Sequence, residues 1–547
     1  MGAVWSRVKV LRIAVRQVLE LSASYERLLQ RIRTDPGLPV PNPTRSFWHD
    51  VLSPIANHVP DALPVYVDAV IIGSGITGTS TARTLFREGG DELSVLMLEA
   101  REACSGATGR NGGHIKPPMY DDYLMLKKKH GPEQAAMLVR FRLKHVREML
   151  AVASEEGILD KCHCREVDSL DVYFRTEAFE EAKEKLRAWK EDMPEESKDC
   201  EWIEGKEAID RFHLSSEVAG VIYSMAGAVH PYRFVTSILA RLVDQHVGRF
   251  YLSTNTPCTG ILTTTGPDGR PLYSVETPRG TVLTSHVVHA TNAWASHLLP
   301  QMRTKIFCVR GNMTAQRPGN ALPSASLDGQ RSWVFYDRHI GYDYLTQLPD
   351  GEHELMFGGG FVQAGDDGLG EIGTSDDSWF NSGVAAHLGG ALPMLFGGNN
   401  WGGEVVPSSS LDHGRKDKRQ VWFEGRVKSM WSGIIGISSD RIPWVGRIPA
   451  KLTSRPLPTY PLSDKDSYSS EKHAEKFRAK VASPGEWLAA GYSGEGMAHA
   501  FLCGRAVALQ ILDRGDETTD WLPDCLGISE IRWTRARAED LIEELWG

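Results

Sequence analysis

The chain has 547 residues, a formal net charge of -9 at pH 7, and 41% hydrophobic and 24% charged residues. Such a composition is ordinary for a soluble globular protein, and the length predicts about two or three domains with a large buried core. The negative charge gives no electrostatic footprint for nucleic acid, and no apolar run approaches the length that a membrane span needs. These features argue against nucleic acid as a partner and against a membrane-spanning chain.

The eight cysteines are scattered without paired C-x-x-C spacing, and Cys162-His163-Cys164 is their one cluster. This usage is typical of a reducing compartment and predicts no metal site. We expect a cytoplasmic location, with mitochondria as the alternative that the early arginines allow. The ending Glu544-Leu-Trp-Gly547 does not match the peroxisomal tripeptide.

Residues 1–35 carry apolar side chains at alternating three- and four-residue spacing, flanked by basic residues. The pattern predicts an amphipathic helix with three open roles: weak contact with a membrane surface, an organelle presequence, or docking on the protein itself. Met1 to Ser6 also match the M-G-x-x-x-[ST] pattern, so myristoylation of Gly2 is a further hypothesis. The prolines of residues 35–43 end the helix and predict a linker or a clamp.

The stretch from Val67 to Ala82 predicts the first turn of a dinucleotide-binding fold. A β-branched run is followed by G-x-G-x-x-G, in which Gly73 permits the turn, Gly75 lets the backbone approach a pyrophosphate, and Gly78 lets the helix pack on the strand. The helix start then faces the phosphates.

A second strand is expected from Ser94 to Leu98, and it ends in Glu99. An acid roughly 20 residues beyond the glycines is where dinucleotide folds bind the ribose hydroxyls, and it argues against a 2′-phosphate. The motif by itself leaves NAD, FAD or no nucleotide open.

The segment Gly106-Ala-Thr-Gly-Arg-Asn-Gly-Gly-His114 follows directly. It closely resembles the D-amino-acid oxidase family of FAD-dependent oxidoreductases, and most of all the branch with γ-glutamylputrescine oxidase and fungal relatives. Small residues suit such a loop, because a planar flavin can approach only a backbone that side chains do not block. The resemblance implies that FAD is the cofactor.

Three later segments resemble motifs of the same family in the same order. Residues 284–294 resemble its V-V-x-A-T-N-A strand and turn, residues 431–446 its W-x-G…T-x-D-x-x-P-x-I-G motif, and residues 487–499 its closing G-x-x-G-x-G-M, which starts a helix expected to end near Leu512. A strand is expected from Arg249 to Ile261. Within it, residues 255–259 resemble the family's strand that holds the adenine, although Pro257 is unfavourable in a central strand.

The residues that these motifs imply beside FAD are Gly73, Gly75, Ile76, Thr77, Gly78, Glu99, Ala100, Arg101, Gly106, Ala107, Thr108, Arg110, Asn111, Gly112, Gly113, His114, Cys258, Ala290, Thr291, Asn292, Asp440, Gly494, Glu495, Gly496 and Met497.

The family resemblance implies an α/β plus α+β fold, in which a Rossmann-type FAD-binding domain is interleaved with an antiparallel-sheet substrate domain. The expected order along the chain is a helical and proline-rich extension at 1–65, FAD-binding parts at 66–120, 223–304 and 429–512, substrate parts at 121–222 and 305–428, an inserted loop at 449–484, and a tail at 513–547.

The family's chemistry is hydride transfer from a carbon that bears an amine to the flavin, which gives an imine that water hydrolyses; oxygen or another acceptor reoxidises the flavin. Members specific for amino acids carry an arginine that binds the substrate carboxylate, and Ile435 stands at about that place here. We therefore expect a small-molecule amine without a free α-carboxylate. Relatives with covalent flavin carry a cysteine where Gly433 stands, so we expect non-covalent FAD.

Candidate catalytic residues are His114, Tyr342, Tyr344 and Trp431. His114 has a side chain that titrates near neutrality, so it is a candidate proton acceptor or flavin-orienting group, and a hydrogen-bonded loop histidine is the alternative. Tyr342 and Tyr344 alternate on a strand and should point to one face, either as substrate contacts or as a structural pair. Trp431 either walls the pocket or packs in the core.

Two other functions stay open. An FAD-dependent aromatic hydroxylase shares the nucleotide fold but would carry a G-D motif before its last flavin helix, where Gly494-Glu495-Gly496-Met497 stands instead. A flavoprotein without turnover, attached to a membrane through residues 1–35, is the third hypothesis.

Overall fold

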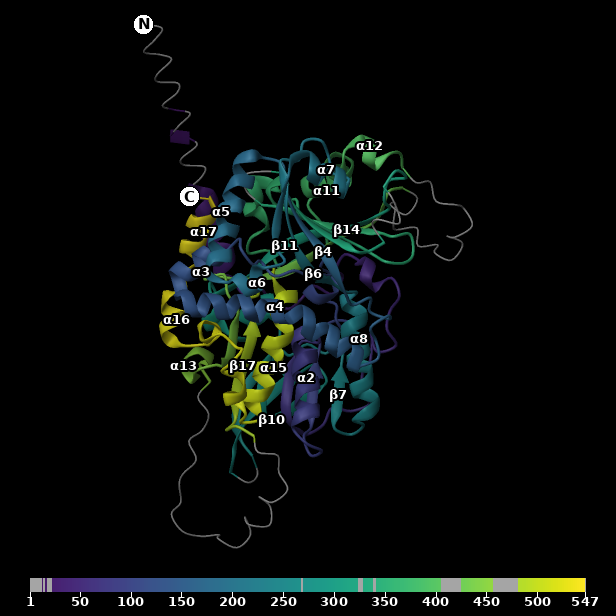
Figure 1. Cartoon of the computed structure of the whole chain (residues 1–547). Coiled ribbons are helices and arrows are strands. Elements are labelled where there is room, and N and C mark those ends of the chain that lie inside the picture. Colours follow the sequence, from purple (N-terminus) through teal and green to yellow (C-terminus); the bar gives the residue numbers. More distant parts are fainter. Residues whose placement is uncertain are drawn as a thin grey trace.

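The computed structural model describes residue 12, residues 15–16, and residues 22–266, 269–322, 328–337, 341–404, 425–455 and 481–546. The myristoylation motif and most of the loop expected at 449–484 lie outside the described residues. Figure 1 shows two sheets one above the other, with the long helix α4 across the level where they meet.

The first sheet has eight strands, and its main path runs β16-β17-β10-β1-β2-β7. The strands from β17 to β7 are parallel, β16 is antiparallel to β17, and β8 and β9 form a hairpin on β10. The apolar, β-branched run of β1 suits a strand with a neighbour on each side. The strands are β1 (Tyr66–Ile72), β2 (Val95–Leu98), β7 (Phe250–Ser253), β8 (Gly260–Thr265), β9 (Pro271–Thr277), β10 (Gly280–His289), β16 (Trp444–Arg447) and β17 (Gly485–Ala490).

Helices α2 (Ile76–Glu88), α8 (Pro231–Gln245) and α15 (Ala500–Ile511) lie side by side over one face of this sheet (Figure 1). The contact between α2 and α15 is close because Gly504 has no side chain: a Cβ there would lie 2.4 Å from the carbonyl oxygen of Thr77. Ser80 Oγ donates a hydrogen bond to the carbonyl of Phe501 at 2.5 Å. The first and the last FAD motifs are therefore held next to each other.

The second sheet has nine strands in the order β15-β11-β14-β13-β12-β4-β6-β3, with β5 paired to β6. All its neighbours are antiparallel except β4 and β12. We call it the roof sheet. Its strands are β3 (His114–Ile115), β4 (Arg165–Tyr173), β5 (Glu201–Glu204), β6 (Gly220–Ala228), β11 (Ile306–Gln316), β12 (Arg331–Tyr336), β13 (Asp343–Gln347), β14 (Leu355–Gly358) and β15 (Val427–Ser438).

The remaining helices pack around the roof sheet and along the edges of the molecule. They are α3 (Tyr123–His130), α4 (Pro132–Glu155), α5 (Thr176–Asp192), α6 (Pro194–Ser197), α7 (Gly205–Phe212), α9 (Ala295–Leu298), α11 (Ser382–Phe396), α12 (Gly398–Trp401), α13 (Ala450–Thr453), α16 (Glu530–Arg535) and α17 (Ala538–Trp546). The break between α3 and α4 falls at Gly131, whose φ of +85° a side chain would disfavour.

Two of the domain boundaries expected from the sequence fall inside strands. The boundary at 222/223 falls inside β6, and the boundary at 428/429 falls inside β15. Both strands belong wholly to the roof sheet, so neither is shared between the two domains. The two-residue strand β3, expected in the first FAD-binding part, also pairs with β6. A sheet closes by backbone pairing between distant segments, so motif spacing alone misplaces such boundaries.

The single strand expected over residues 249–261 is also wrong. It divides into β7 and β8, which pair with different neighbours, and Pro257 lies in the turn between them. Proline cannot donate to a strand ladder, and here it marks the point where the chain leaves the sheet.

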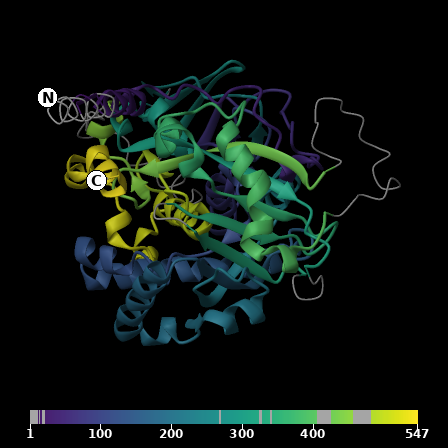
Figure 2. The ribbon, with the colours of Figure 1, turned by 90° about the horizontal axis from the view of Figure 1, so that it is seen from above.

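Residues 22–33 of the predicted amino-terminal helix are helical and dock on the protein itself. Leu28 and Ile32 are buried in a cluster with Val309 of β11 and Leu541 of α17. Figure 2 shows this helix beside the carboxy-terminal helix. For this half of the helix the docking hypothesis holds, whereas residues 1–11 lie outside the described part of the chain.

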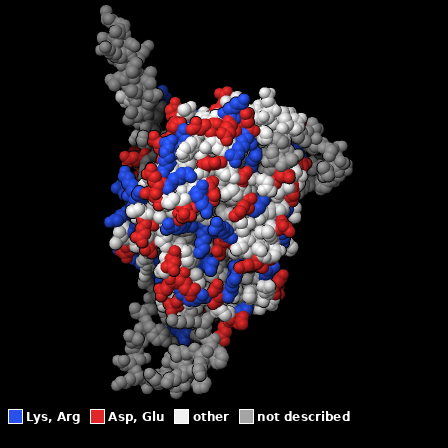
Figure 3. All heavy atoms as spheres, viewed as in Figure 1, with Lys and Arg blue, Asp and Glu red and all other residues white. Residues whose placement is uncertain are grey.

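Basic and acidic side chains are interspersed over the face shown in Figure 3, without a large patch of one sign. No helix among the described residues is both long enough and apolar enough to cross a membrane.

The docked helix gives a test of the packing. Leu28→Ala should destabilise the contact between residues 22–33 and α17 by about 2–5 kcal/mol, because Leu28 is fully buried. Tyr25→Ala, on the same helix at a residue that is 37% exposed, should change stability by no more than about 0.5 kcal/mol. Hydrogen exchange of residues 22–33 measures both effects. Equal protection in the two variants would contradict the docking.

Candidate cofactor and active site

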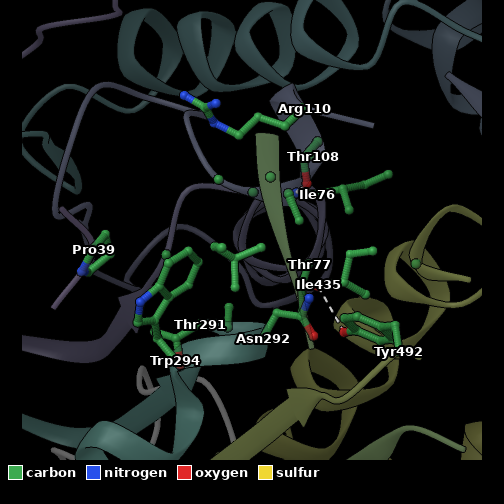
Figure 4. A pocket seen from close by; sticks show the side chains of 18 of the residues that line it. Pro39, Ile76, Thr77, Thr108, Arg110, Thr291, Asn292, Trp294, Ile435 and Tyr492 are labelled. Atoms are coloured by element: carbon green, nitrogen blue, oxygen red, sulfur yellow. Dashed lines mark hydrogen bonds between the residues drawn. The ribbon is translucent and has the colours of Figure 1, made fainter. Parts of the chain in front are cut away.

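A cavity of about 1530 Å³, including its open mouth, lies between the two sheets. It runs from the end of β2 to the start of α15. In Figure 4, Pro39 and Trp294 lie on one side, and Tyr492, bonded to Thr77, lies on the other.

The glycine turn forms one wall of the cavity. Gly73 has a φ of +110°, and a Cβ there would lie 2.6 Å from the carbonyl oxygen of Ala290. At Gly75 a Cβ would meet Thr108 Oγ1 at 3.0 Å, and at Gly78 it would meet the Gly73 oxygen at 2.0 Å. The geometry agrees with the predicted turn at Gly73 and the predicted helix packing at Gly78, whereas the approach of a pyrophosphate at Gly75 stays a prediction.

Glu99 lies at the cavity wall where β2 ends. One carboxylate oxygen accepts hydrogen bonds from the amide and the hydroxyl of Ser74 at 3.1 and 2.7 Å, and the other accepts from the Arg101 amide at 3.1 Å. These donors orient the carboxylate and leave it acceptor capacity for ribose hydroxyls.

The loop from Gly106 to Gly113 is held by side chains from three distant segments. Trp48 Nε1 donates to the Asn111 carbonyl at 2.6 Å, Trp431 Nε1 donates to the Arg110 carbonyl at 2.9 Å, and Thr346 donates to the Gly112 carbonyl. Trp431 is fully buried and does not line the cavity. The structure therefore supports the alternative of core packing over the predicted catalytic role. The hydrogen bond of Trp431 to Arg110 positions this loop.

A buried ion cluster stands behind the loop. Asp377, which is fully buried, accepts two hydrogen bonds from Arg101 Nη1 at 2.9 and 3.1 Å and lies 3.5 Å from Arg110 Nε. Arg110 Nη1 also donates to the Ser432 carbonyl at 2.7 Å, and the Asp377 carbonyl accepts from the Thr44 amide at 2.7 Å. We call Arg101, Arg110 and Asp377 the ion cluster.

Residues 36–44 form a strap along the cavity. Gly37, Leu38 and Pro39 line it, and the strap is fixed where the Val40 carbonyl accepts from Arg101 and where Thr44 bonds to Ser432 and Asp377. The proline-rich segment is therefore a clamp rather than a free linker.

Two residues that line the cavity each carry a buried donor without a partner among the described residues. Thr291 Oγ1 and Trp294 Nε1 both belong to cavity-lining residues, and neither makes a hydrogen bond there. Buried polar atoms are normally satisfied, so their position predicts a ligand with acceptor groups, such as a phosphate or a purine nitrogen. Together with the glycine wall and Glu99, they fit FAD.

The far end of the cavity is closed by the start of α15 and by the roof sheet. Tyr492, Gly494, Gly496 and Met497 precede the helix, which begins at Ala500. A helix amino terminus stabilises negative charge, which suits the end of the site where a reduced flavin would carry it.

The roof contributes mostly small and apolar residues to this end, which are Gly311, Met313, Tyr344, Gly433, Ile434 and Ile435.

Most of the residues predicted beside FAD line the cavity, and their contact with FAD stays a prediction. Those that line it are Gly73, Gly75, Ile76, Thr77, Glu99, Ala100, Arg101, Gly106, Ala107, Thr108, Arg110, Asn111, Cys258, Ala290, Thr291, Asn292, Gly494, Gly496 and Met497. The predicted cofactor-binding residues that do not line the cavity are Gly78, Gly112, Gly113, His114, Asp440 and Glu495. Of the other catalytic candidates, Tyr344 lines the cavity, whereas Tyr342 and Trp431 do not.

Asp440 belongs to a different part of the molecule. Its carboxylate accepts hydrogen bonds from Arg532 of α16 at 2.8 and 3.1 Å and from Ser438 Oγ at 2.6 Å. Burial favours its neutral form, but Arg532, Ser438 and Lys129 together outweigh burial and hold the pKa of Asp440 below its usual value. The expected contact with FAD is therefore wrong, and Asp440 joins the carboxy-terminal tail to the end of β15.

The sequence suggests that His114 titrates near neutrality, and the structure contradicts this expectation. Burial, helped by the charge of Lys116, lowers its pKa to about 3, so the imidazole is neutral. Its Nδ1 lies 2.7 Å from Ser332 Oγ, and its ring stands edge-on to Tyr344 with centroids 5.4 Å apart. His114 thus packs beside Tyr344 of the cavity wall. It fits the alternative prediction of a hydrogen-bonded loop histidine.

Comparisons with known proteins show the family of the chain. The family described as FAD dependent oxidoreductase, abbreviated DAO, matches residues 68–510. The chain belongs to this family. Its members bind FAD, so FAD is the cofactor.

The chain is also 38% identical to gamma-glutamylputrescine oxidoreductase of Escherichia coli K12 over 71 residues, which is 13% of this chain and 16% of that protein. The aligned part thus spans about a sixth of that relative. Solved structures share the fold at low identity. Glycine oxidase from Geobacillus kaustophilus has a TM-score of 0.58 at 16% identity and covers 85% of this chain and 99% of its own.

Iminodiacetate oxidase from Chelativorans has a TM-score of 0.53 at 14% identity, with 83% and 98% covered. At such identities the likeness shows the fold alone.

Sequence reasoning missed the strap at 37–39, Thr44, Asp377 and Trp294. The strap had a signal in its prolines but no sign of where it would lie. Asp377 had none, because an acidic residue in a long polar stretch looks like an ordinary surface residue until Arg101 is found against it.

Asp377→Asn should loosen the cofactor site, because it leaves Arg101 and Arg110 buried with less negative charge to balance them. Breaking a buried pair in this way costs about 3–5 kcal/mol. We expect a lower melting temperature and a larger loss of FAD on gel filtration than in the wild type. Asp376→Asn, at the neighbouring, less buried residue, is the control. If both variants retain FAD equally, the ion cluster does not support the site.

Proposed function

We propose that this protein oxidises the C–N bond of an amine that carries no free α-carboxylate. The observation that supports the proposal is the roof wall at Ile435, which lines the far end of the cavity with Ile434, Met313 and Gly311. FAD, when bound, accepts the hydride from the carbon next to the nitrogen, and oxygen or another acceptor takes the electrons from it. Water hydrolyses the resulting imine.

The apolar wall argues against a carboxylate at this end. A carboxylate buried there without a partner would cost several kcal/mol. The two arginines that line the cavity are already engaged: Arg101 with Asp377, and Arg110 with the carbonyls of Ser105 and Ser432. Neither offers a free bidentate clamp. The wall would instead exclude water and hold the apolar part of an amine beside the cofactor.

The glycine turn, Glu99 and the loop from Gly106 would hold FAD at its diphosphate, ribose and flavin parts. We propose that the flavin is held without a covalent bond. Gly433 has no side chain to link, and the one cysteine that lines the cavity, Cys258, lies in the segment expected at the adenine.

The substrate proposal is tested with matched pairs of compounds that differ only in the α-carboxylate, such as cadaverine and lysine, mixed with the holoenzyme without oxygen. We expect the amine to bleach the flavin at least about tenfold faster than its amino acid, because only the amine avoids an unpaired buried carboxylate. Efficient reduction by simple free amino acids would contradict the proposal.

The same assay separates the alternatives. Bleaching by no amine would favour a flavoprotein without turnover, and NADPH consumption with an aromatic compound would favour a hydroxylase.

Acid precipitation of the holoenzyme tests the mode of cofactor binding. All the yellow colour should appear in the supernatant, since non-covalent flavin is released when the protein unfolds. Colour that stays with the pellet after repeated washing would show a covalent bond, and a peptide map would locate it.

A further inference from the structure

A second cavity lies between the end of α3, the end of β15 and the carboxy-terminal tail, and it measures about 1070 Å³ including its open mouth. Figure 1 shows α3, α16 and α17 along one edge of the molecule. None of the described residues lines both this cavity and the cofactor cavity, so the cofactor does not account for it. We call it the tail cavity.

One arginine fixes a wall of the tail cavity. Arg532 of α16 donates hydrogen bonds to both oxygens of Asp440 at 2.8 and 3.1 Å, and to the carbonyl of Leu526 at 2.8 Å. It also donates to the carbonyl of Ile442 at 2.9 Å. Arg532 therefore balances the charge of Asp440 and holds α16 against the end of β15. Because its donors are used in this way, it shapes the cavity and is not free to bind a ligand.

Two residues that line the tail cavity each carry a buried polar atom without a partner among the described residues. These atoms are Ser439 Oγ and His130 Nε2, and Ser439 is only 4% exposed. Burial and the charge of Lys129 lower the pKa of His130 against the opposing charge of Asp440, so the ring is neutral and can present an N–H at Nε2. Buried polar atoms are normally hydrogen-bonded, so this pair predicts a ligand with acceptor atoms.

Two basic side chains of the tail cavity keep donors for a ligand. The guanidinium of Arg535 makes no hydrogen bond or ion pair with any residue that the structure describes. Lys129 donates to the Asp440 carbonyl at 3.2 Å and retains further N–H donors. Four Lys or Arg residues and three Asp residues line the cavity, which leaves one positive charge in excess. This excess favours an anionic ligand.

We propose that the tail cavity binds a small oxyanion, which is the phosphate or the carboxylate group of a metabolite. Arg535 would pair with two of its oxygens in the fork geometry that a guanidinium favours, and Lys129 would add a second charge. Ser439 and His130 would donate to it from the buried side. The inference goes beyond the proposed function, because this site is separate from the cofactor cavity.

An anion in the tail cavity would join segments that are distant in the sequence. Its donors come from the end of α3, from the residue after β15 and from α16. Leu541 of α17 lines the same cavity and packs in the cluster with Leu28 of the docked amino-terminal helix. A ligand that binds only the folded state stabilises it, so we expect the anion to strengthen the docking of the tail.

Calorimetric titration of the full-length holoenzyme tests the site, with bound FAD occupying the diphosphate site of the cofactor cavity. Inorganic phosphate and succinate are titrated separately, and sodium chloride keeps the ionic strength constant. Arg535→Gln should weaken binding of the recognised anion about 10- to 100-fold, because a charged hydrogen-bonded pair is lost. Arg33→Gln is the matched control and should bind as the wild type, since Arg33 contacts Glu539 of the same tail at 3.4 Å but does not line the cavity.

Ser439→Ala tests the buried side of the tail cavity. Anion binding should weaken about 3- to 30-fold, because one buried donor to a charged group is lost. The melting temperature of the holoenzyme without added anion should not fall, since alanine removes a buried hydroxyl that has no partner among the described residues. A purely structural serine would give the opposite result, with a lower melting temperature and unchanged anion binding.

Hydrogen exchange shows where the anion acts. The recognised anion should slow the exchange of residues 524–541 in the wild type and leave it unchanged in Arg535→Gln. Binding of either anion with these losses supports the site, and the anion that binds more tightly identifies the group. If neither anion binds, or if either variant binds as tightly as the wild type, the proposal is wrong. No step of this test uses amine oxidation, so its failure would leave the proposed function intact.

Discussion

The buried ion cluster is the constraint on which the rest of the site depends. Asp377 comes from the segment between two roof elements, Arg101 and Arg110 come from the loop after β2, and the strap and β15 bond to the same groups. Charges this deeply buried are tolerated only when they are paired and hydrogen-bonded. The cluster therefore ties the loop, the roof and the strap into one arrangement, and the position of each depends on the other two.

The two sheets contribute different kinds of groups to the cavity. The parallel sheet supplies backbone to the cavity, through the glycine turn and the residues after β2 and β10, because a dinucleotide is held mainly by amides and one acid. The roof sheet supplies side chains, and at the far end these are apolar or aromatic. Cofactor binding thus follows from the features shared with the family, whereas we propose that selectivity depends on residues such as Ile435 and Tyr344 that the roof brings to the cavity.

The sequence predictions are accurate where a residue's role depends on neighbours close in the sequence, and they fail where it depends on a distant segment. The turn at Gly73 and the helix packing at Gly78 are predictable because they arise within one strand, one turn and one helix, whose geometry is set by nearby residues of the chain. Asp440 was misassigned because its partner, Arg532, lies 92 residues further along the chain. No local pattern reveals such a partner.

By itself, the sequence determined the family, the cofactor and the approximate order of the two sheets, since each depends on short motifs with fixed backbone geometry. Only the tertiary structure decided which side chains share a space. It buries His114 so that its charge is lost, and it removes Trp431 from the cavity. It also sets Glu495 beside Arg142, although the two residues are far apart in the sequence. Burial and charge are properties of neighbourhoods in space, and folding alone creates them.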